Sequence, residues 1–218
     1  EREDQRDALL VRPGIAAQAV EDLPRGARVG TSSLRRVCQL RARRPDLDVV
    51  PLRGNVDTRL RRLEEGSLDA ILLACAGLER LGLGARITQV LGLDLTLPAV
   101  GQGVIGIECR EDDARSRAAL GALHHEESFV RLRAERAFAR ALEGSCHSPI
   151  AAHAVLEDGA LTVHGFVGAP DGSEVYRDVE RGAPADTEAL GHRLAERIKA
   201  AGAGALLERL RQEAATAS

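Results

Sequence analysis

The sequence predicts an α/β protein built from two kinds of unit. Residues 28–97 alternate short apolar runs with stretches of helical periodicity, a pattern typical of a largely parallel sheet covered by helices. Residues 150–180 instead contain three strand-like stretches separated by Asp-Gly turns, which indicates an antiparallel sheet in a small α+β unit. A chain of 218 residues is long enough to bury a proper core, so one or two domains are expected.

The first unit is expected to contain three strand–helix pairs, and Pro45 and Gly66 stop the first two helices. Ligands of open α/β sheets bind outside the carboxyl ends of the strands, so the residues that follow these strands are the first candidates for a site. The expected strands end near Val29 and cover residues 49–52 and 69–74, and the expected helices cover residues 34–44, residues 56–65 and a stretch through Leu78 and Leu81.

A crossing segment over residues 97–103 separates the two units. Residues 101–106 match the GxGxxG pattern literally, but they precede an expected strand over residues 104–109 instead of opening a helix. We therefore interpret them as a glycine-rich hinge and not as a dinucleotide loop. The later elements are expected as a helix from Asp112 or Asp113 to about Leu123, a helix over residues 126–142, strands over residues 150–156, 161–167 and 174–180, and helices over residues 187–200 and 203–214.

Positive charge is concentrated in one part of an otherwise acidic chain. The net charge is −3, which argues against nucleic-acid binding by bulk electrostatics. Residues 28–62 nevertheless hold ten arginines against three aspartates, a local excess of seven positive charges. A partner with several negative groups is therefore expected. No apolar run approaches the length of a membrane span, so no membrane partner is expected.

The first candidate for an anion site is the stretch Val-Gly-Thr-Ser-Ser-Leu-Arg-Arg at residues 29–36. Serines are natural N-caps, so free backbone N–H groups, hydroxyls and two arginines are expected to meet at the positive end of a helix. The alternative is an ordinary capped helix with solvated arginines. Guanidinium groups bind carboxylate or phosphate in a bidentate fashion, and the arginines near the strand ends are Arg35, Arg36, Arg53 and Arg59.

The cysteines are too scattered for a disulfide scaffold, and none forms a CxxC pair, which favours a reducing cytoplasm. Cys146 lies in a tight helix-to-strand connection, where by position alone it is either a small buried side chain or a reactive thiol. His124 and His125 are not expected to bind a metal, because adjacent helical side chains point apart, and no metal site is predicted. The four cysteines are Cys38, Cys75, Cys109 and Cys146.

Six stretches match a known family in the family's order and cover nearly the whole chain. They are VGTSSLRR (29–36), LRGNVDTRL (52–60), AGLERLG (76–82), LPAVGQG (97–103), AERA (134–137) and LEGSC (142–146). Taken together, they resemble porphobilinogen deaminase, also called hydroxymethylbilane synthase.

The resemblance implies a dipyrromethane cofactor held by a thioether to the cysteine of the last stretch, which is Cys146 here. Ser145 stands where glycine is common and His147-Ser148 replace a more usual Gln-Val, but neither change removes the thiol. The family's arginines and polar groups bind the acetate and propionate carboxylates of cofactor and substrate. By resemblance, the cofactor-binding residues are Thr31, Ser32, Ser33, Arg35, Arg36, Arg53 and Asn55, and the substrate-binding residues are Arg59, Arg80 and Gln102.

The resemblance also implies a domain organisation, with two domains like periplasmic binding proteins and a third that carries the cysteine. The family's catalytic aspartate lies in a Lys-Asp-Val-Pro context that does not occur here. We therefore expect most of the first domain to be missing, the catalytic residue to be unknown and the fragment to be inactive alone. The expected parts are a first-domain remnant (1–8), the second α/β domain with a carboxylate-binding cleft (9–97), a return segment into the first domain (98–123) and an α+β C-terminal domain with a three-stranded antiparallel sheet and helices (126–218).

The activity implied by the resemblance is the deaminative condensation of four porphobilinogen molecules onto a cysteine-bound primer, which yields linear hydroxymethylbilane and ammonia in tetrapyrrole biosynthesis. The implied partner is this small molecule alone, and a monomeric cytoplasmic protein is expected. A different class stays open, namely a non-catalytic anion-binding module or a damaged paralogue that keeps the cleft without the chemistry.

Overall fold

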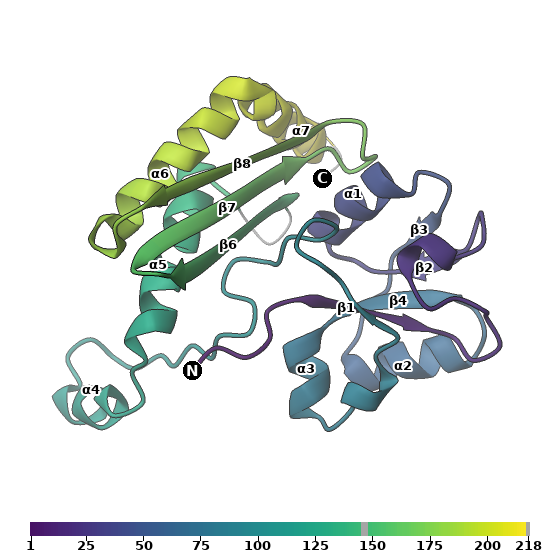
Figure 1. Ribbon diagram of the computed structural model, residues 1–218, viewed down its shortest axis with the longest axis horizontal. Helices are drawn as coiled ribbons and strands as arrows, with labels where there is room; N and C mark the ends of the chain where they lie inside the picture. Colours follow the sequence, from purple (N-terminus) through teal and green to yellow (C-terminus); the bar gives the residue numbers. More distant parts are fainter. Residues whose placement is uncertain (145–147, 217–218) are drawn as a thin grey trace.

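The computed structural model describes residues 1–144 and 148–216 and contains two sheets (Figure 1). The first sheet has the strand order β3-β2-β4-β1-β5. Strand β2 runs parallel to β3 and β4, as expected, whereas β1 runs antiparallel to both β4 and β5, so the sheet is mixed. Its strands are β1 (Asp7–Val11), β2 (Arg28–Gly30), β3 (Asp48–Val50), β4 (Ala70–Ala74) and β5 (Gln89–Val90).

Strand β1 lies in the interior of the sheet, and the sequence patterns do not predict it. Its pairing with β4 brings Leu9 opposite Leu72, a contact that local periodicity does not encode. Asp7 and Ala8 are both 0% exposed and are part of this strand. They belong to the five-stranded sheet, while the assignment of residues 1–8 to a remnant of the first domain, which the resemblance implies, stays a prediction.

Helices cover both faces of this sheet. They are α1 (Leu34–Arg43), α2 (Val56–Glu64) and α3 (Cys75–Arg80), with short 3-10 helices η1 (Val20–Asp22) and η2 (Gly84–Arg86). Leu40 of α1 packs with Leu9 on one face, and Leu60 of α2 and Leu78 of α3 pack with Leu10 on the other. Both α1 and α2 end within one residue of the prediction, because their stop signals are local.

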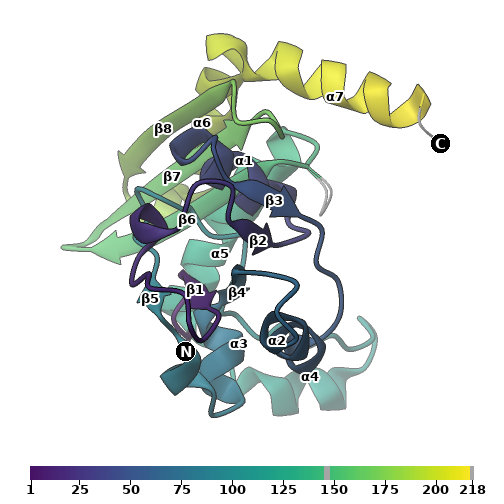
Figure 2. The ribbon, with the colours of Figure 1, turned by 90° about the vertical axis from the view of Figure 1, so that its right-hand side faces the viewer.

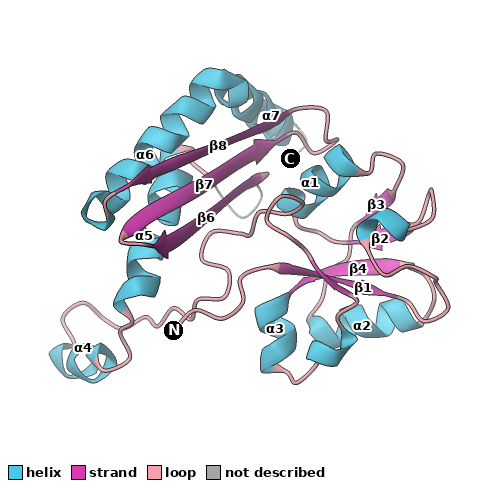
Figure 3. Cartoon of the chain, in the orientation of Figure 1, coloured by secondary structure: helices cyan, strands magenta, loops and turns pink. Residues whose placement is uncertain are grey.

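The second unit is an antiparallel sheet of order β6-β7-β8 with helices on one face, which confirms the predicted α+β unit (Figure 3). Its elements are α5 (Glu126–Ala141), β6 (Ile150–Glu157), β7 (Ala160–Gly168), β8 (Val175–Gly182), a 3-10 turn (Pro184–Asp186), α6 (Thr187–Ile198), a π-type segment (Lys199–Ala203) and α7 (Gly204–Thr216). Phe138 and Leu194 pack on Val163 in its core. Gly191 lets α5 and α6 approach closely, since a Cβ there would lie 2.4 Å from the Ala134 carbonyl oxygen.

The strand predicted over residues 104–109 is wrong. These residues form no strand, and Ile105 and Ile107 are 65% and 54% exposed. Helix α4 (Ala114–Gly121) forms close to its predicted place but buries none of its residues, and Figure 1 shows it projecting from the body of the protein. An apolar run becomes a strand only when another strand pairs with it, and no described strand does so here.

The two units touch along α1. Cys38 of α1 and Leu97 of the crossing segment form a small buried cluster with Ala151 of β6 and Phe166 of β7. The face of the three-stranded sheet that α5 and α6 leave open therefore rests on α1 (Figure 2). Across the described ranges, no helix is long and apolar enough to cross a membrane.

Candidate functional site

The carboxyl end of β2 leads through Thr31, Ser32 and Ser33 into α1. The Thr31 hydroxyl accepts a hydrogen bond from the Ser33 backbone N–H at 3.3 Å, and Thr31 is buried. Ser33 holds the N-cap position, but its side chain makes no capping hydrogen bond, so the predicted capping by this residue is wrong. Ser32 is exposed. The hydroxyl of Ser33 at the start of α1 is thus not used to cap the helix.

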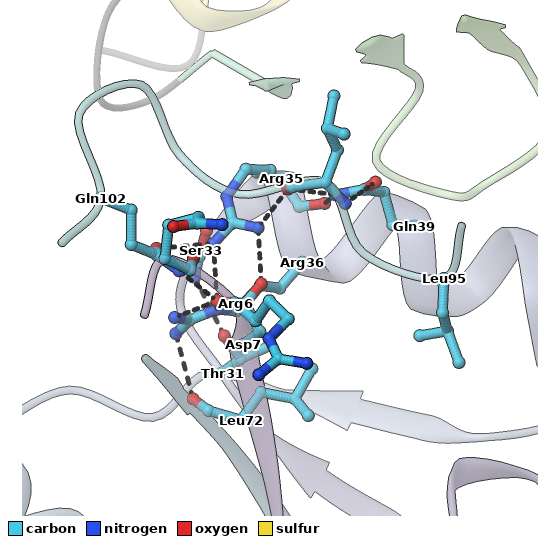
Figure 4. A network of polar contacts seen from close by, with 12 residues as sticks. Arg6, Asp7, Thr31, Ser33, Arg35, Arg36, Gln39, Leu72, Leu95 and Gln102 are labelled. Carbon is cyan, nitrogen blue, oxygen red and sulfur yellow. Dashed lines mark hydrogen bonds and ion pairs between the residues drawn. The ribbon is translucent and has the colours of Figure 1, made fainter. Parts of the chain in front are cut away.

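Arg35 and Arg36 both bind the carboxylate of Asp7, the first residue of β1 (Figure 4). Arg35 donates to Oδ2 at 2.6 Å and to Oδ1 at 3.2 Å, and Arg36 donates to Oδ1 at 2.7 and 3.1 Å. The three residues are 0%, 4% and 7% exposed, in sequence order. The alternative of solvated arginines is therefore wrong, and the nearest anion is supplied by the protein. We call these three residues the Asp7 cluster.

Asp7 is the site residue that the sequence patterns do not reveal. Its partners lie 28 and 29 residues further along the chain, beyond the reach of helical or strand periodicity. The available signal is the carboxylate placed directly before the apolar run Ala-Leu-Leu-Val. A charge that enters a buried strand requires a paired cation, so this signal indicates that a cation lies nearby.

The Asp7 cluster has a net charge of +1, because two guanidinium groups face one carboxylate. Burial by itself would raise the pKa of Asp7, but Arg36 and Arg35 hold that pKa well below its ordinary value, so the carboxylate stays ionised. Burial lowers the pKa of Arg35, and Asp7 opposes that effect. The Nε of Arg35 is buried and has no hydrogen-bond partner in the described part of the chain. The net positive charge of the cluster can attract a further anion.

The residues that follow the second predicted strand, over residues 49–52, also contribute to the site. Asn55 caps α2 by accepting a hydrogen bond from the Thr58 backbone N–H at 2.9 Å, and the Arg59 Nε donates to the Gly54 carbonyl at 2.8 Å. Burial lowers the pKa of Arg59, and the positive charge of Arg36 lowers it further, so these two guanidinium groups lie close enough to repel each other. Arg59 thus lies within electrostatic range of the Asp7 cluster.

The remaining predicted residues divide into two groups. Gln102 lies in the site, where its Nε2 donates to Asp7 Oδ1 at 2.9 Å and to the Gln5 carbonyl at 2.5 Å. Arg53 is exposed, and no described residue forms a hydrogen bond or ion pair with its side chain. Arg80 is exposed at the end of α3, and no contact within the described ranges joins it to the Asp7 cluster.

Cys146, the predicted attachment point, lies outside the described residues, in the connection between α5 and β6. Two other thiols are buried, and burial raises the pKa of both Cys38 and Cys75 to about 12, which keeps them protonated. Cys109 is exposed. The two buried thiols are therefore unreactive.

No group of three or more His, Cys, Asp or Glu side chains that could hold a metal occurs among the residues that the structure describes. His125 instead caps α5, where its Nδ1 accepts a hydrogen bond from the Ser128 backbone N–H at 3.3 Å. His124 pairs with Glu126 at 2.8 Å. Both histidines have local structural contacts.

The residues of the site fit a ligand that carries several carboxylates. The excess positive charge of the Asp7 cluster provides one binding point. Arg59 and the exposed Arg53 extend the positive region beyond it. A dipyrromethane bears acidic side chains, so its charge and the chemistry of these donors agree.

Comparison with known families accounts for both units. A family model described as "Porphobilinogen deaminase, dipyromethane cofactor binding domain" matches residues 1–118, which include the whole Asp7 cluster. A second model, described as "Porphobilinogen deaminase, C-terminal domain", matches residues 129–200. The family implies porphobilinogen as substrate, a dipyrromethane cofactor and a place in tetrapyrrole biosynthesis. Because the first match alone spans more than half of the sequence, the chain belongs to the porphobilinogen deaminase family.

Proposed function

We propose that the chain binds porphobilinogen and takes part in hydroxymethylbilane synthesis, the stepwise deaminative condensation of four porphobilinogen molecules on a primer attached to Cys146. The observation that carries this proposal is the Asp7 cluster, in which two buried guanidinium groups share one carboxylate and the Arg35 Nε has no partner in the described chain. Buried positive charge with spare donors suits the carboxylates of a pyrrole ligand.

The residues of this chain would bind and orient the ligand. The dipyrromethane, when bound, supplies the pyrrole carbon to which new units are joined. Arg35, Arg36 and Arg53, with the hydroxyls of Thr31, Ser32 and Ser33 and the amide of Asn55, would hold its carboxylates, while Arg59, Arg80 and Gln102 would hold the incoming porphobilinogen. Holding both ligands in register contributes proximity and orientation. We assign no residue of this sequence as general acid or base.

The domain boundaries are also a proposal. We infer that the segment over residues 98–123 packs against a further domain of the family fold. The exposed Ile105 and Ile107 support this inference, as does α4, which buries none of its residues in the described structure. The C-terminal unit over residues 126–218 would carry the cofactor.

A second candidate is a non-catalytic anion-binding protein. The observation that favours it is the Asp7 cluster itself, because buried arginines can bind an anion without any chemistry. Turnover of porphobilinogen distinguishes the two candidates, because the non-catalytic protein would bind porphobilinogen without releasing ammonia.

Replacing Arg59 with leucine is expected to weaken porphobilinogen binding by about 10- to 100-fold, which is the value of one charge-assisted hydrogen bond. Isothermal calorimetry measures the affinity and thermal unfolding measures the stability. The matched control is Arg61→Leu on the same helix, where Arg61 is exposed and only approaches Glu65 at 3.8 Å. Equal affinities of the two variants would show that Arg59 does not contact the ligand.

The attachment site is tested by intact-mass spectrometry of the protein isolated from its own cells. We expect a mass increment equal to two porphobilinogen-derived units and a colour reaction with an acidic aldehyde reagent. The Cys146→Ser variant should lose the increment, whereas Cys109→Ser, which changes the exposed thiol, should retain it. An unmodified mass in active protein would contradict the assignment to Cys146.

A further inference from the structure

Asp7 has no role in the function proposed above, yet it is the most highly connected carboxylate of the site. Its two oxygens accept five hydrogen bonds, two from Arg35, two from Arg36 and one from Gln102 (Figure 4). The residue is 0% exposed and starts β1, which lies in the interior of the five-stranded sheet. Such a carboxylate is held in place by an interior strand of the sheet and by its own hydrogen bonds.

The same contacts fix the arginines in one orientation. Arg35 also donates from Nη1 to the Leu97 carbonyl at 2.6 Å and from Nη2 to the Gln102 side chain at 3.3 Å. Arg36 also donates from Nη1 to the Leu72 carbonyl at 3.1 Å. A guanidinium has five N–H bonds, so two N–H bonds of Arg36 remain for a ligand, whereas the one N–H of Arg35 without a partner among the described residues, at Nε, is buried.

We propose that Asp7 is a positioning residue of the carboxylate site, which holds Arg35 and Arg36 side by side so that their net positive charge and the remaining N–H groups of Arg36 meet one further carboxylate. This inference rests on the proposed function, because it assumes that a porphobilinogen-type ligand binds there. Asp7 acts through the arginines and does not touch the ligand itself. Its negative charge also cancels one of the two positive charges and limits the cluster to one additional anion.

A positioning role for Asp7 and a purely electrostatic role predict opposite changes in porphobilinogen affinity for Asp7→Asn. Asp7→Asn removes one negative charge and raises the net charge of the cluster from one to two. If the charge alone determined binding, the variant would hold anions more tightly. If Asp7 positions the arginines, the variant binds porphobilinogen more weakly, because the new amide N–H faces guanidinium donors and displaces them.

The experiment measures porphobilinogen and inorganic phosphate binding by calorimetry for the unchanged chain and for Asp7→Asn. We expect porphobilinogen affinity to fall at least about 10-fold while phosphate affinity stays equal or rises, a split that general unfolding would not produce. Equal or tighter porphobilinogen binding by the variant would overturn the inference. If the unchanged chain itself failed to bind porphobilinogen, the proposed function would be overturned instead.

A second pair of variants covers the case in which Asp7→Asn does not fold. The double variant Asp7→Asn with Arg35→Gln keeps the net charge of the natural cluster, and its reference is Arg35→Gln alone. We expect the double variant to bind porphobilinogen at least about 10-fold more weakly than Arg35→Gln, although its cluster is more positive. An affinity equal to or above that of Arg35→Gln would exclude positioning by Asp7.

Discussion

Replacing Glu135 with alanine is expected to lower the free energy of unfolding by about 3–5 kcal/mol, because it breaks a buried ion pair by removing one partner. Glu135 is 0% exposed and receives two hydrogen bonds from Arg2, at 2.6 and 3.1 Å. Its carboxylate also accepts the backbone N–H groups of Gly101 at 2.8 Å and Ala154 at 2.9 Å. The variant leaves one guanidinium and two amides without their partner.

Thermal denaturation checks this prediction, and a fall in Tm of about 6–20 °C is expected for a chain of this size. The control is Glu188→Ala, because Glu188 is half exposed and pairs only loosely with Arg133 at 3.3 Å and Arg140 at 3.9 Å. That variant should lose no more than about 1 kcal/mol. A similar small loss for Glu135→Ala would mean that its four contacts contribute little to stability.

Glu135 also connects three segments that lie far apart in the sequence. It joins the N-terminal segment at Arg2, the crossing segment at Gly101 and the edge of β6 at Ala154. The crossing segment, predicted as a hinge, is thus bonded on both sides, and the backbone N–H of Glu3 also donates to the Gly103 carbonyl at 3.0 Å. Whether the segment acts as a hinge stays a prediction, and any movement there would first have to break these contacts.

Acidification from about pH 6.5 to about pH 4 is expected to cost about 3 kcal/mol of stability through His153, and about 2 kcal/mol of that loss falls above pH 5. His153 is 1% exposed and its Nδ1 has no hydrogen-bond partner in the described part of the chain. Burial, then the charges of Arg2 and Arg131, and then His164 lower the pKa of His153 to about 3. Glu135 lies 3.9 Å from the ring, but Arg2 neutralises it.

Acid lowers the stability because His153 is protonated at a higher pH in the unfolded chain than in the folded chain. The unfolded chain takes up a proton on His153 near pH 6.5, whereas the folded chain does so only near pH 3. Between these values the unfolded state binds more protons, so each fall in pH favours unfolding. Urea denaturation at a series of pH values measures the slope.

The variant His153→Leu should flatten that slope, and His192→Leu, which changes an exposed histidine of α6, should leave it as it is. The partly buried His164, whose pKa burial also lowers, would supply the slope that remains. An unchanged slope in His153→Leu would show that this residue titrates normally in the folded protein.

Local signals in the sequence account for much of the fold. Pro45 and Gly66 stop α1 and α2 within one residue of the prediction, and the Asp158-Gly159 turn joins β6 to β7 as expected, with positive φ at both residues. The missed strand β1 and the false strand over residues 104–109 have the same cause. Both are short apolar runs, and only the presence or absence of a pairing strand distinguishes them.

The sequence by itself determined the fold class, most element boundaries, the family and the arginines at the two strand ends, because each of these depends on residues close together in the chain. The tertiary structure alone decided what those arginines contact. It placed Asp7 against Arg35 and Arg36, and Arg2 against Glu135 across 133 residues. Burial of a charge makes its pairing obligatory, and which charges become buried is settled only when distant segments pack together.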